Sequence, residues 1–300
     1  MAPQINTSRY YLEWKGHQVA DLTAFHSHIL SSRPDKPVVY LAGDSSLDNK
    51  FWVQKSDLED LPDVQTPGIY QGILKDPKPK PDVAFWLNHA LGNEATALNT
   101  AVEESMLRDR DEDLLEHDKF IRDHIRAEDV LIVSVGANDI ALRPTKSTMW
   151  NMFRLAWLTP RWFLERGWAL GHFKHMFKDQ VQTYISRLVE KTKPKAIIVC
   201  MIYYPLERTE DQSSWADMQL KLLGYDRWPS QLQTGIRKMY ELATQKVQIP
   251  GTTVVPCALF EVLDGKNSED YTARVEPSCE GGRKMAVCFK DILDSLQHLV

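Results

Sequence analysis

Short, nearly continuous apolar segments recur along the 300-residue chain, separated by longer amphipathic stretches. The clearest are rich in β-branched residues and lie at 38–42, 130–135, 196–202 and 253–257, with a weaker one at 83–87. Apolar strands of about five to seven residues are typical of a parallel sheet that is covered by helices on both faces. The pattern therefore predicts a strand at each of these five places.

Between the predicted strands lie segments with the spacing of amphipathic helices. They cover 21–31, 103–127, 181–190, 230–247 and 282–299. In the first of them Leu22, Phe25 and Ile29 share one stripe, and Asp21 is placed to cap the helix N-terminus. Strands that alternate with helices in this way predict a doubly wound α/β fold, which we expect to form a single domain over residues 1–300.

The composition adds exclusions to this picture. With 43% hydrophobic and 26% charged residues, the chain is too apolar for intrinsic disorder. Its 36 Lys and Arg against 41 Asp and Glu give a net charge of −5, which argues against nucleic acid as a partner. No apolar run is long enough to span a membrane and residues 1–13 lack a secretory pattern, so we expect a cytoplasmic protein without a transmembrane segment.

No signature of a metal, nucleotide or flavin site is present. The four cysteines, Cys200, Cys257, Cys279 and Cys288, have no CxxC spacing, and the chain has no Gly-x-Gly-x-x-Gly, Walker loop or histidine-rich cluster. We therefore expect reduced thiols and no cofactor.

Candidate chemistry follows two of the predicted strands. In a parallel sheet, ligands bind beyond the carboxyl ends of the strands. There the chain places Ser45 in a Gly-Asp-Ser turn after the first strand and Asn138 in a Gly-x-Asn-Asp turn after another. A serine in such a turn is placed like a nucleophile, and an asparagine can donate to an oxyanion. We expect Asp44 to bond nearby backbone N–H groups and Asp139 to orient its own loop.

Together the segments 39–47 and 133–140 resemble the first and third sequence blocks of SGNH, or GDSL-type, hydrolases. The resemblance extends over about residues 37–295 and implies a three-layer α/β/α fold with a flavodoxin-like sheet. It implies Ser45 as nucleophile and an oxyanion hole made by Ser45, Ala101 and Asn138, with Asp44, Gly136 and Asp139 in support. Ala101 enters through 99–102, which resembles the second block, Asn-x-Gly, with alanine at the glycine position.

The fourth block departs from the pattern of these hydrolases. Segment 276–286 matches at its Pro, Ser, Gly and Met-Ala positions, but Glu276 stands where the family has its catalytic His, and Ala273 where it has Asp. No frame gives Asp-x-x-His, and beyond residue 175 the chain has only His298. An unperturbed glutamate, with a pKa of about 4.3, is a much weaker base than imidazole. Burial would raise that pKa towards neutrality.

Three hypotheses about activity follow. In the first, Ser45 and Glu276 hydrolyse or transfer an acyl group from an apolar ester or thioester. In the second, Glu276 and the oxyanion hole perform non-covalent lyase or cyclase chemistry. In the third, the site binds without turnover. A competing interpretation makes Glu276 a surface carboxylate that opens the helix beginning near Gly282.

The segment 149–177 holds four of the nine tryptophans and is locally basic. Pro160 and Gly167 should break it into short helices. We predict a helical insertion at 147–178 that covers the site as a lid, with substrate contacts from Trp150, Phe153, Trp157 and Trp162 to an apolar acyl or polycyclic substrate. The alternatives are a packed helical subdomain, a peripheral helix that touches lipid, and a dimer contact. The sequence leaves the oligomeric state open.

Overall fold

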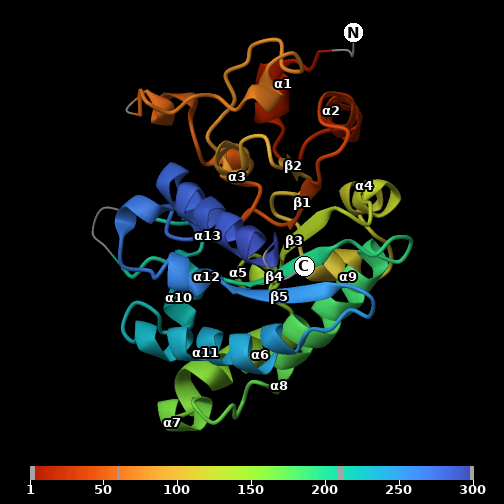
Figure 1. Cartoon of the computed structure of the whole chain (residues 1–300). Helices are drawn as coiled ribbons and strands as arrows, with labels where there is room; N and C mark the ends of the chain where they lie inside the picture. Colours follow the sequence, from red (N-terminus) through yellow and green to blue (C-terminus); the bar gives the residue numbers. More distant parts are fainter. Residues whose placement is uncertain (1–3, 60, 209–212, 298–300) are drawn as a thin grey trace.

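The centre of the protein is a five-stranded parallel sheet. Its strands are β1 (Val38–Gly43), β2 (Thr96–Asn99), β3 (Val130–Ser134), β4 (Ala196–Met201) and β5 (Thr253–Ala258). They are hydrogen-bonded in the order β2-β1-β3-β4-β5 (Figure 1). This is the flavodoxin-like order of a doubly wound sheet, and it confirms the predicted α/β fold class. The computed structural model describes residues 4–59, 61–208 and 213–297.

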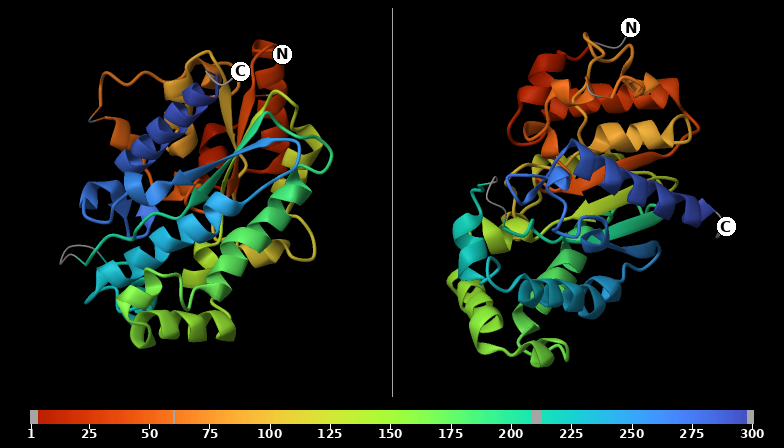
Figure 2. Two further views of the ribbon diagram at one scale, coloured as in Figure 1. Left: turned by 60° about the horizontal axis from the view of Figure 1, so that its bottom comes forward. Right: turned by 90° about the vertical axis from the view of Figure 1, so that its left-hand side faces the viewer.

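Helices cover both faces of this sheet (Figures 1 and 2). On one face α3 (Val83–Leu91) packs against α13 (Cys279–Gln297), and on the other lie α9 (Val181–Leu188) and α11 (Pro229–Leu242). The remaining α-helices are α1 (Thr7–Leu12), α2 (Val19–Ser32), α4 (Glu116–His124), α5 (Ala137–Ala141), α6 (Lys146–Phe153), α7 (Arg161–Leu164), α8 (Gly171–Lys174), α10 (Asp217–Leu222) and α12 (Leu259–Val262). Every residue of β1 to β4 is buried, so the core lies between the sheet and the two helical layers.

Shorter elements complete the chain. The 3₁₀ turns are η1 (Asn49–Phe51), η2 (Lys55–Leu58), η3 (Gly68–Tyr70), η4 (Leu107–Arg110), η7 (Thr244–Lys246) and η8 (Ser268–Asp270), and the π-helical stretches are η5 (Arg154–Leu158) and η6 (His175–Gln180). A small antiparallel pair joins β6 (Tyr271–Thr272) to β7 (Glu276–Pro277). Within the described ranges, no helix combines the length and apolar character needed to cross a bilayer.

The strand predicted at 83–87 is wrong, because these residues begin helix α3. Asp82 caps the helix by accepting a hydrogen bond from the backbone N–H of Phe85 at 2.7 Å. Residues 83–88 are all buried, because α3 lies between β2 and α13, so the helix shows the continuous apolar run of a buried strand. The missing fifth strand is β2, whose last residue, Asn99, begins the segment 99–102 that resembles the second hydrolase block.

Helix boundaries also differ from prediction. The single helix expected over 103–127 is divided into η4 and α4. Asp21 is not an N-cap: α2 begins at Val19, and Asp21 lies in its first turn, where it pairs with Arg9. Helix α13 begins at Cys279, after the β7 strand rather than near Gly282.

Candidate active site

Ser45 lies in a tight turn at the carboxyl end of β1. Both the N–H and the hydroxyl of Ser46 donate to Asp44 Oδ1, at 3.1 and 2.7 Å, so the Asp44 side chain closes the turn as predicted. A Cβ at Gly43 would lie 1.9 Å from the carbonyl oxygen of Ser134, so only glycine fits where β1 meets β3. Ser45 itself is 7% exposed, and among the described residues its backbone N–H has no hydrogen-bond partner.

Asn138 reaches the same place from the end of β3. Gly136, with φ +102°, turns the chain into α5, and a Cβ there would lie 2.9 Å from the Phe177 ring. One amide hydrogen of Asn138 goes to the carbonyl oxygen of Ser105 at 3.1 Å, which leaves the second hydrogen of Nδ2 for another acceptor. Asp139 accepts from the N–H groups of Leu107 and Arg108 at 2.6 and 3.3 Å and so ties the start of α5 to η4.

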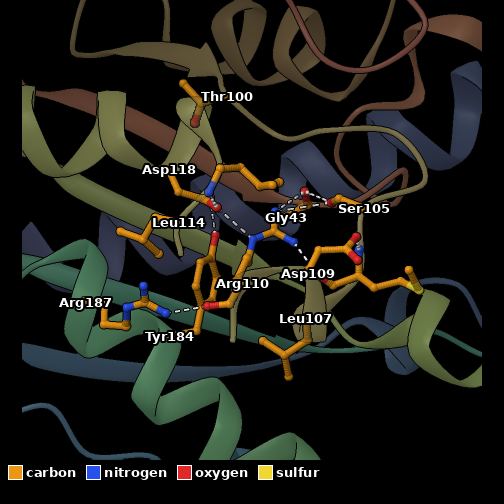
Figure 3. A network of polar contacts seen from close by, with 12 residues as sticks. Gly43, Thr100, Ser105, Leu107, Asp109, Arg110, Leu114, Asp118, Tyr184 and Arg187 are labelled. Carbon is orange, nitrogen blue, oxygen red and sulfur yellow. Dashed lines mark hydrogen bonds and ion pairs between the residues drawn. The ribbon is translucent and has the colours of Figure 1, made fainter. Parts of the chain in front are cut away.

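A buried arginine network lies behind these two turns (Figure 3). Arg110 donates to the Gly43 carbonyl at 3.4 Å and to Ser105 Oγ at 3.2 Å, while Ser105 Oγ also donates to the Gly43 carbonyl at 3.1 Å. On its other side the Arg110 guanidinium pairs with Asp118 at 2.9 Å, and Asp118 accepts from the Tyr184 hydroxyl at 2.7 Å. The network therefore joins Ser105, the acceptor of the Asn138 amide, to the last residue of β1.

Glu276 lies in β7 and is only 2% exposed, so the interpretation as a surface carboxylate is wrong. Its Oε1 accepts from the indole N–H of Trp215 at 3.2 Å, whereas Oε2 is buried and has no partner of ordinary hydrogen-bond geometry in the described residues. Burial raises the pKa of Glu276 to about 8, and the neighbouring Ser45 hydroxyl and Trp215 indole hold that pKa down in part. Ser45 and Glu276 are therefore close neighbours.

A second buried carboxyl, Glu103, lies behind the serine turn. Its Oε1 accepts from the indole N–H of Trp52 at 3.2 Å, and its backbone N–H donates to Asp48 at 3.0 Å. Burial first, and then the charge of Glu276, raise the pKa of Glu103 to about 9. Two carboxyls that share a water-poor region resist ionising together, so the pair favours its protonated forms near neutral pH. Sequence reasoning missed this residue, because it lies in a charged stretch that resembles an exposed helix.

Ala101 is not brought together with Ser45, Asn138 and Glu276. It is fully buried, its N–H donates to Asn99 Oδ1 at 3.1 Å, and it does not line the cavity described below. The structure therefore does not support its predicted place in an oxyanion hole. The groups that remain able to receive a negatively charged oxygen are the backbone N–H of Ser45 and the free amide hydrogen of Asn138.

An apolar cavity opens from these residues, and its empty space, mouth included, is about 1030 Å³. Its polar end contains Asp44, Ser45, Asn138 and Glu276. Apolar side chains from four regions form most of the remaining wall, beside the polar Gln219: Met152, Leu155, Phe173 and Phe177 from the insertion; Met201, Ile202 and Tyr203 at the end of β4 and after it; Leu220 and Leu223 around α10; and Leu232, Ile236 and Met239 from α11. The site therefore combines a few convergent polar groups with an apolar surround.

The four aromatic residues predicted to contact the substrate from the lid are not the ones that line the cavity. Trp150, Phe153, Trp157 and Trp162 are 58%, 45%, 44% and 52% exposed and do not line the cavity. Met152 and Leu155 do line it. With about 100° of rotation per residue, positions 150, 153 and 157 lie on one side of a helix, and 152 and 155 on the other. The α6–η5 part of the insertion thus faces the cavity with Met152 and Leu155 and faces outward with its aromatic residues, whereas Phe173 and Phe177 line the cavity from further along the chain.

No family profile and no curated protein matches the chain. Among solved structures it is similar to the native aryl esterase of M. smegmatis, with 14% identity, 87% of this chain and 99% of that chain covered, and a TM-score of 0.43. The sheet order and the strand-end turns at 43–47 and 136–139 are those that the sequence resemblance to SGNH hydrolases predicts.

Two further solved structures give similar values. Est24, a carbohydrate acetylesterase from Sinorhizobium meliloti, has 13% identity, with 87% and 100% of the two chains covered and a TM-score of 0.43. A phospholipase A1 from Streptomyces albidoflavus NA297 has 11% identity, with 87% and 99% covered and a TM-score of 0.43.

Proposed function

We propose that the protein is a serine hydrolase-like enzyme that hydrolyses or transfers the acyl group of an apolar ester or thioester. The observation that supports this function is the meeting of Ser45, Asn138 and a buried carboxyl, Glu276, at the polar end of one apolar cavity. An acyl chain fits the apolar wall, and its carbonyl group then lies at the only part of the lining that carries these polar side chains.

In this mechanism Ser45 Oγ attacks the acyl carbonyl carbon while the Glu276 carboxylate takes the hydroxyl proton. The negative charge that develops on the carbonyl oxygen is received by the Ser45 N–H and the Asn138 amide. The protonated Glu276 then gives its proton to the leaving oxygen or sulfur, which departs with the electron pair of the broken bond. Water, or another acceptor, repeats the sequence on the acyl-serine with Glu276 again as base.

The raised pKa makes a glutamate workable in the position of the missing histidine. A catalytic acid–base group is most effective when its pKa lies near the working pH. With a pKa of about 8, Glu276 can exchange a proton in both directions near neutrality, which a solvated carboxyl with a pKa of about 4.5 cannot. Burial in the cavity wall therefore supplies what the residue type lacks.

One observation favours a second function, non-covalent acid–base catalysis of an elimination or cyclisation. At pH 7 a carboxyl with a pKa of about 8 is protonated in about nine-tenths of the molecules. A protonated Glu276 can donate to a substrate directly, without an acyl-serine. The apolar wall would accept a polycyclic substrate as readily as an acyl chain.

Trapping distinguishes these functions. We expect a fluorophosphonate to label the wild-type protein, with fragmentation placing the adduct on Ser45, and Ser45→Ala to abolish both labelling and turnover of p-nitrophenyl esters. Ser46→Ala is the matched control and should still be labelled. Turnover of an apolar substrate that survives Ser45→Ala would establish the non-covalent alternative. If the wild-type protein shows no labelling and no turnover, the hydrolase is refuted and the site is that of a binding protein.

A further inference from the structure

Large apolar side chains are exposed over one face of the molecule, beside the cavity. They are Trp150, Phe153, Trp157, Met218, Leu222 and Trp228, each between 44% and 72% exposed. We call this set the aromatic face. A contiguous apolar surface is rare on monomeric proteins unless it meets a partner. The aromatic face comes from α6 and η5 together with α10 and the start of α11, elements that lie in the lower half of Figure 1.

Direct contacts join most of these residues into one surface. Trp150 and Phe153 stack with ring centroids 5.9 Å apart, and Phe153 and Trp157 lie about one helical turn apart. The indole N–H of Trp157 donates to the carbonyl of Leu222 at 2.8 Å, and the rings of Trp157 and Trp228 meet edge to face at 5.4 Å. Two chain segments more than sixty residues apart thus build a single surface.

The charge of the insertion is opposite to that of the rest of the molecule. Residues 147–178 contain five Lys and Arg and one Glu, a net charge of +4, so the remaining residues sum to −9 of the total of −5. Arg154 and Lys174 are exposed, and neither has a carboxylate partner among the described residues. Arg227 lies over the Trp228 ring at 5.2 Å. Cations interspersed among tryptophans are the composition of peripheral helices that bind anionic lipid.

The aromatic face and the cavity share the same elements. Leu155 and Leu220 line the cavity from the inner sides of η5 and α10, whose outer sides carry Trp157 and Leu222. Trp215 connects the two regions directly, because it is 37% exposed, lines the cavity and donates to Glu276. A hydrophobic chain that enters the cavity beside Trp215 moves from the apolar surface of the aromatic face to the apolar wall of the cavity.

From this geometry we infer that the aromatic face docks the protein on the surface of an anionic phospholipid bilayer. The tryptophans enter the interface between headgroups and acyl chains, and the surrounding cations meet the anionic headgroups. A second copy of the chain is a poorer partner, since a two-fold contact would place two surfaces of like charge against each other. That the substrate is drawn from the bilayer rests on the proposed function; docking itself does not.

The test is co-sedimentation of the full-length protein with vesicles. We expect binding to phosphatidylcholine vesicles that contain phosphatidylserine, weaker binding to phosphatidylcholine alone, and loss of binding as salt is raised. Trp150→Glu with Phe153→Glu should weaken partition by at least about tenfold. Leu12→Glu and Val287→Glu, at positions that are 76% and 45% exposed outside the aromatic face, are the matched controls and should bind as wild type.

Further variants and controls separate the contribution of charge from effects on folding and from dimer formation. Arg154→Gln with Lys174→Gln should remove the preference for phosphatidylserine and leave binding to phosphatidylcholine. Unfolding temperatures and light scattering report whether each variant is folded and monomeric. Absence of vesicle binding, or a wild-type dimer that Trp150→Glu with Phe153→Glu dissociates, would overturn the inference. Ser45→Ala should bind vesicles normally, because docking does not need the serine. A wild-type protein that binds vesicles but is not labelled by the fluorophosphonate would refute the hydrolase and leave the docking inference standing.

Discussion

The two sides of the cavity hold their polar groups very differently. On the side of β1 and β3, Asp44 accepts two hydrogen bonds from its own turn, Asp139 accepts two from backbone N–H groups at η4, and Asn138 is fixed to Ser105. On the other side Glu276 has one hydrogen bond, from Trp215, and a buried oxygen with none. The first side is therefore preorganised for an oxyanion, while the second contains the group whose protonation state is free to change.

The difference indicates where the chemistry of this protein is decided. In the proposed mechanism the strand-end turns at 43–47 and 136–139 supply a nucleophile and oxyanion donors, which fit several reactions. Whether an acyl-serine forms depends on the proton that Glu276 holds or takes. We therefore expect variants on the Glu276 side to change pH dependence and variants on the Asn138 side to change rate alone.

Removing the base has the largest expected effect. Glu276→Gln keeps the shape of the side chain and its contact with Trp215 but cannot take the Ser45 proton, so kcat for a p-nitrophenyl ester should fall by about 10²–10⁴-fold. In the wild type, kcat/KM should rise with pH to a plateau, with an apparent pKa near 8. The residual rate of Glu276→Gln should lack that titration. A variant with wild-type kcat would remove Glu276 from the mechanism.

Asn138→Ala should have the next largest effect, with kcat lowered by about 10²–10³-fold and the apparent pKa unchanged. Ala101→Gly is the matched comparison, because the N–H of residue 101 is already donated to Asn99, and we expect kcat to stay at the wild-type value. Steady-state kinetics across pH measure both. A loss of rate in Ala101→Gly as large as that in Asn138→Ala would place residue 101 in the oxyanion hole after all.

The side of β1 and β3, whose polar groups have more hydrogen bonds, is also the side whose residues the sequence predicted better. Gly43 is needed where β1 meets the backbone of β3, and Gly136 where the chain takes a positive φ. The turns that follow them are local features, so Ser45 and Asn138 could be located from neighbouring residues alone. The sheet followed from apolar runs, except that α3 is buried all round and so has the run of a strand. A four-residue strand such as β2 is too short for periodicity to reveal.

The opposite side depends on contacts between distant segments. Glu276 is brought against Trp215, sixty-one residues away in the chain, and its burial cannot be deduced from its neighbours. Glu103 was missed for the same reason. In the segment 147–178, an apolar pattern with residues on both sides of a helix does not say which side is inward, so Trp150, Phe153 and Trp157 were assigned to the cavity instead of Met152 and Leu155.

Trp215→Phe tests the single hydrogen bond on the Glu276 side. The indole N–H stabilises the charged carboxylate, so its loss should raise the apparent pKa of the kcat/KM profile by roughly one unit and lower the rate at pH 7 several-fold. Trp228→Phe removes an indole from the neighbouring surface with no contact to Glu276 and should leave the profile in place. A rate loss in Trp215→Phe at constant pKa would instead indicate a packing role.

The smallest effect concerns stability and pH. Because the pKa of Glu276 is raised from 4.5 to about 8 in the folded protein, the fold retains a proton that the unfolded chain releases above about pH 4.5. The folded state therefore binds more protons between these two values, and its free energy of unfolding falls as pH rises through that window and levels above about pH 8. Glu103, with its pKa raised to about 9, adds to the fall in the same direction.

Thermal unfolding across pH measures this slope. Glu276→Gln cannot lose a proton, so its Tm should fall less than that of the wild type between pH 5 and pH 8, and the two curves should separate most at the alkaline end. Glu103→Gln should behave in the same way, whereas Glu104→Gln, which changes the next carboxyl along the chain, should follow the wild type. A Glu276→Gln curve parallel to the wild type would mean that the carboxyl is solvated and charged in the fold, which would remove the physical basis for a glutamate base beside Ser45.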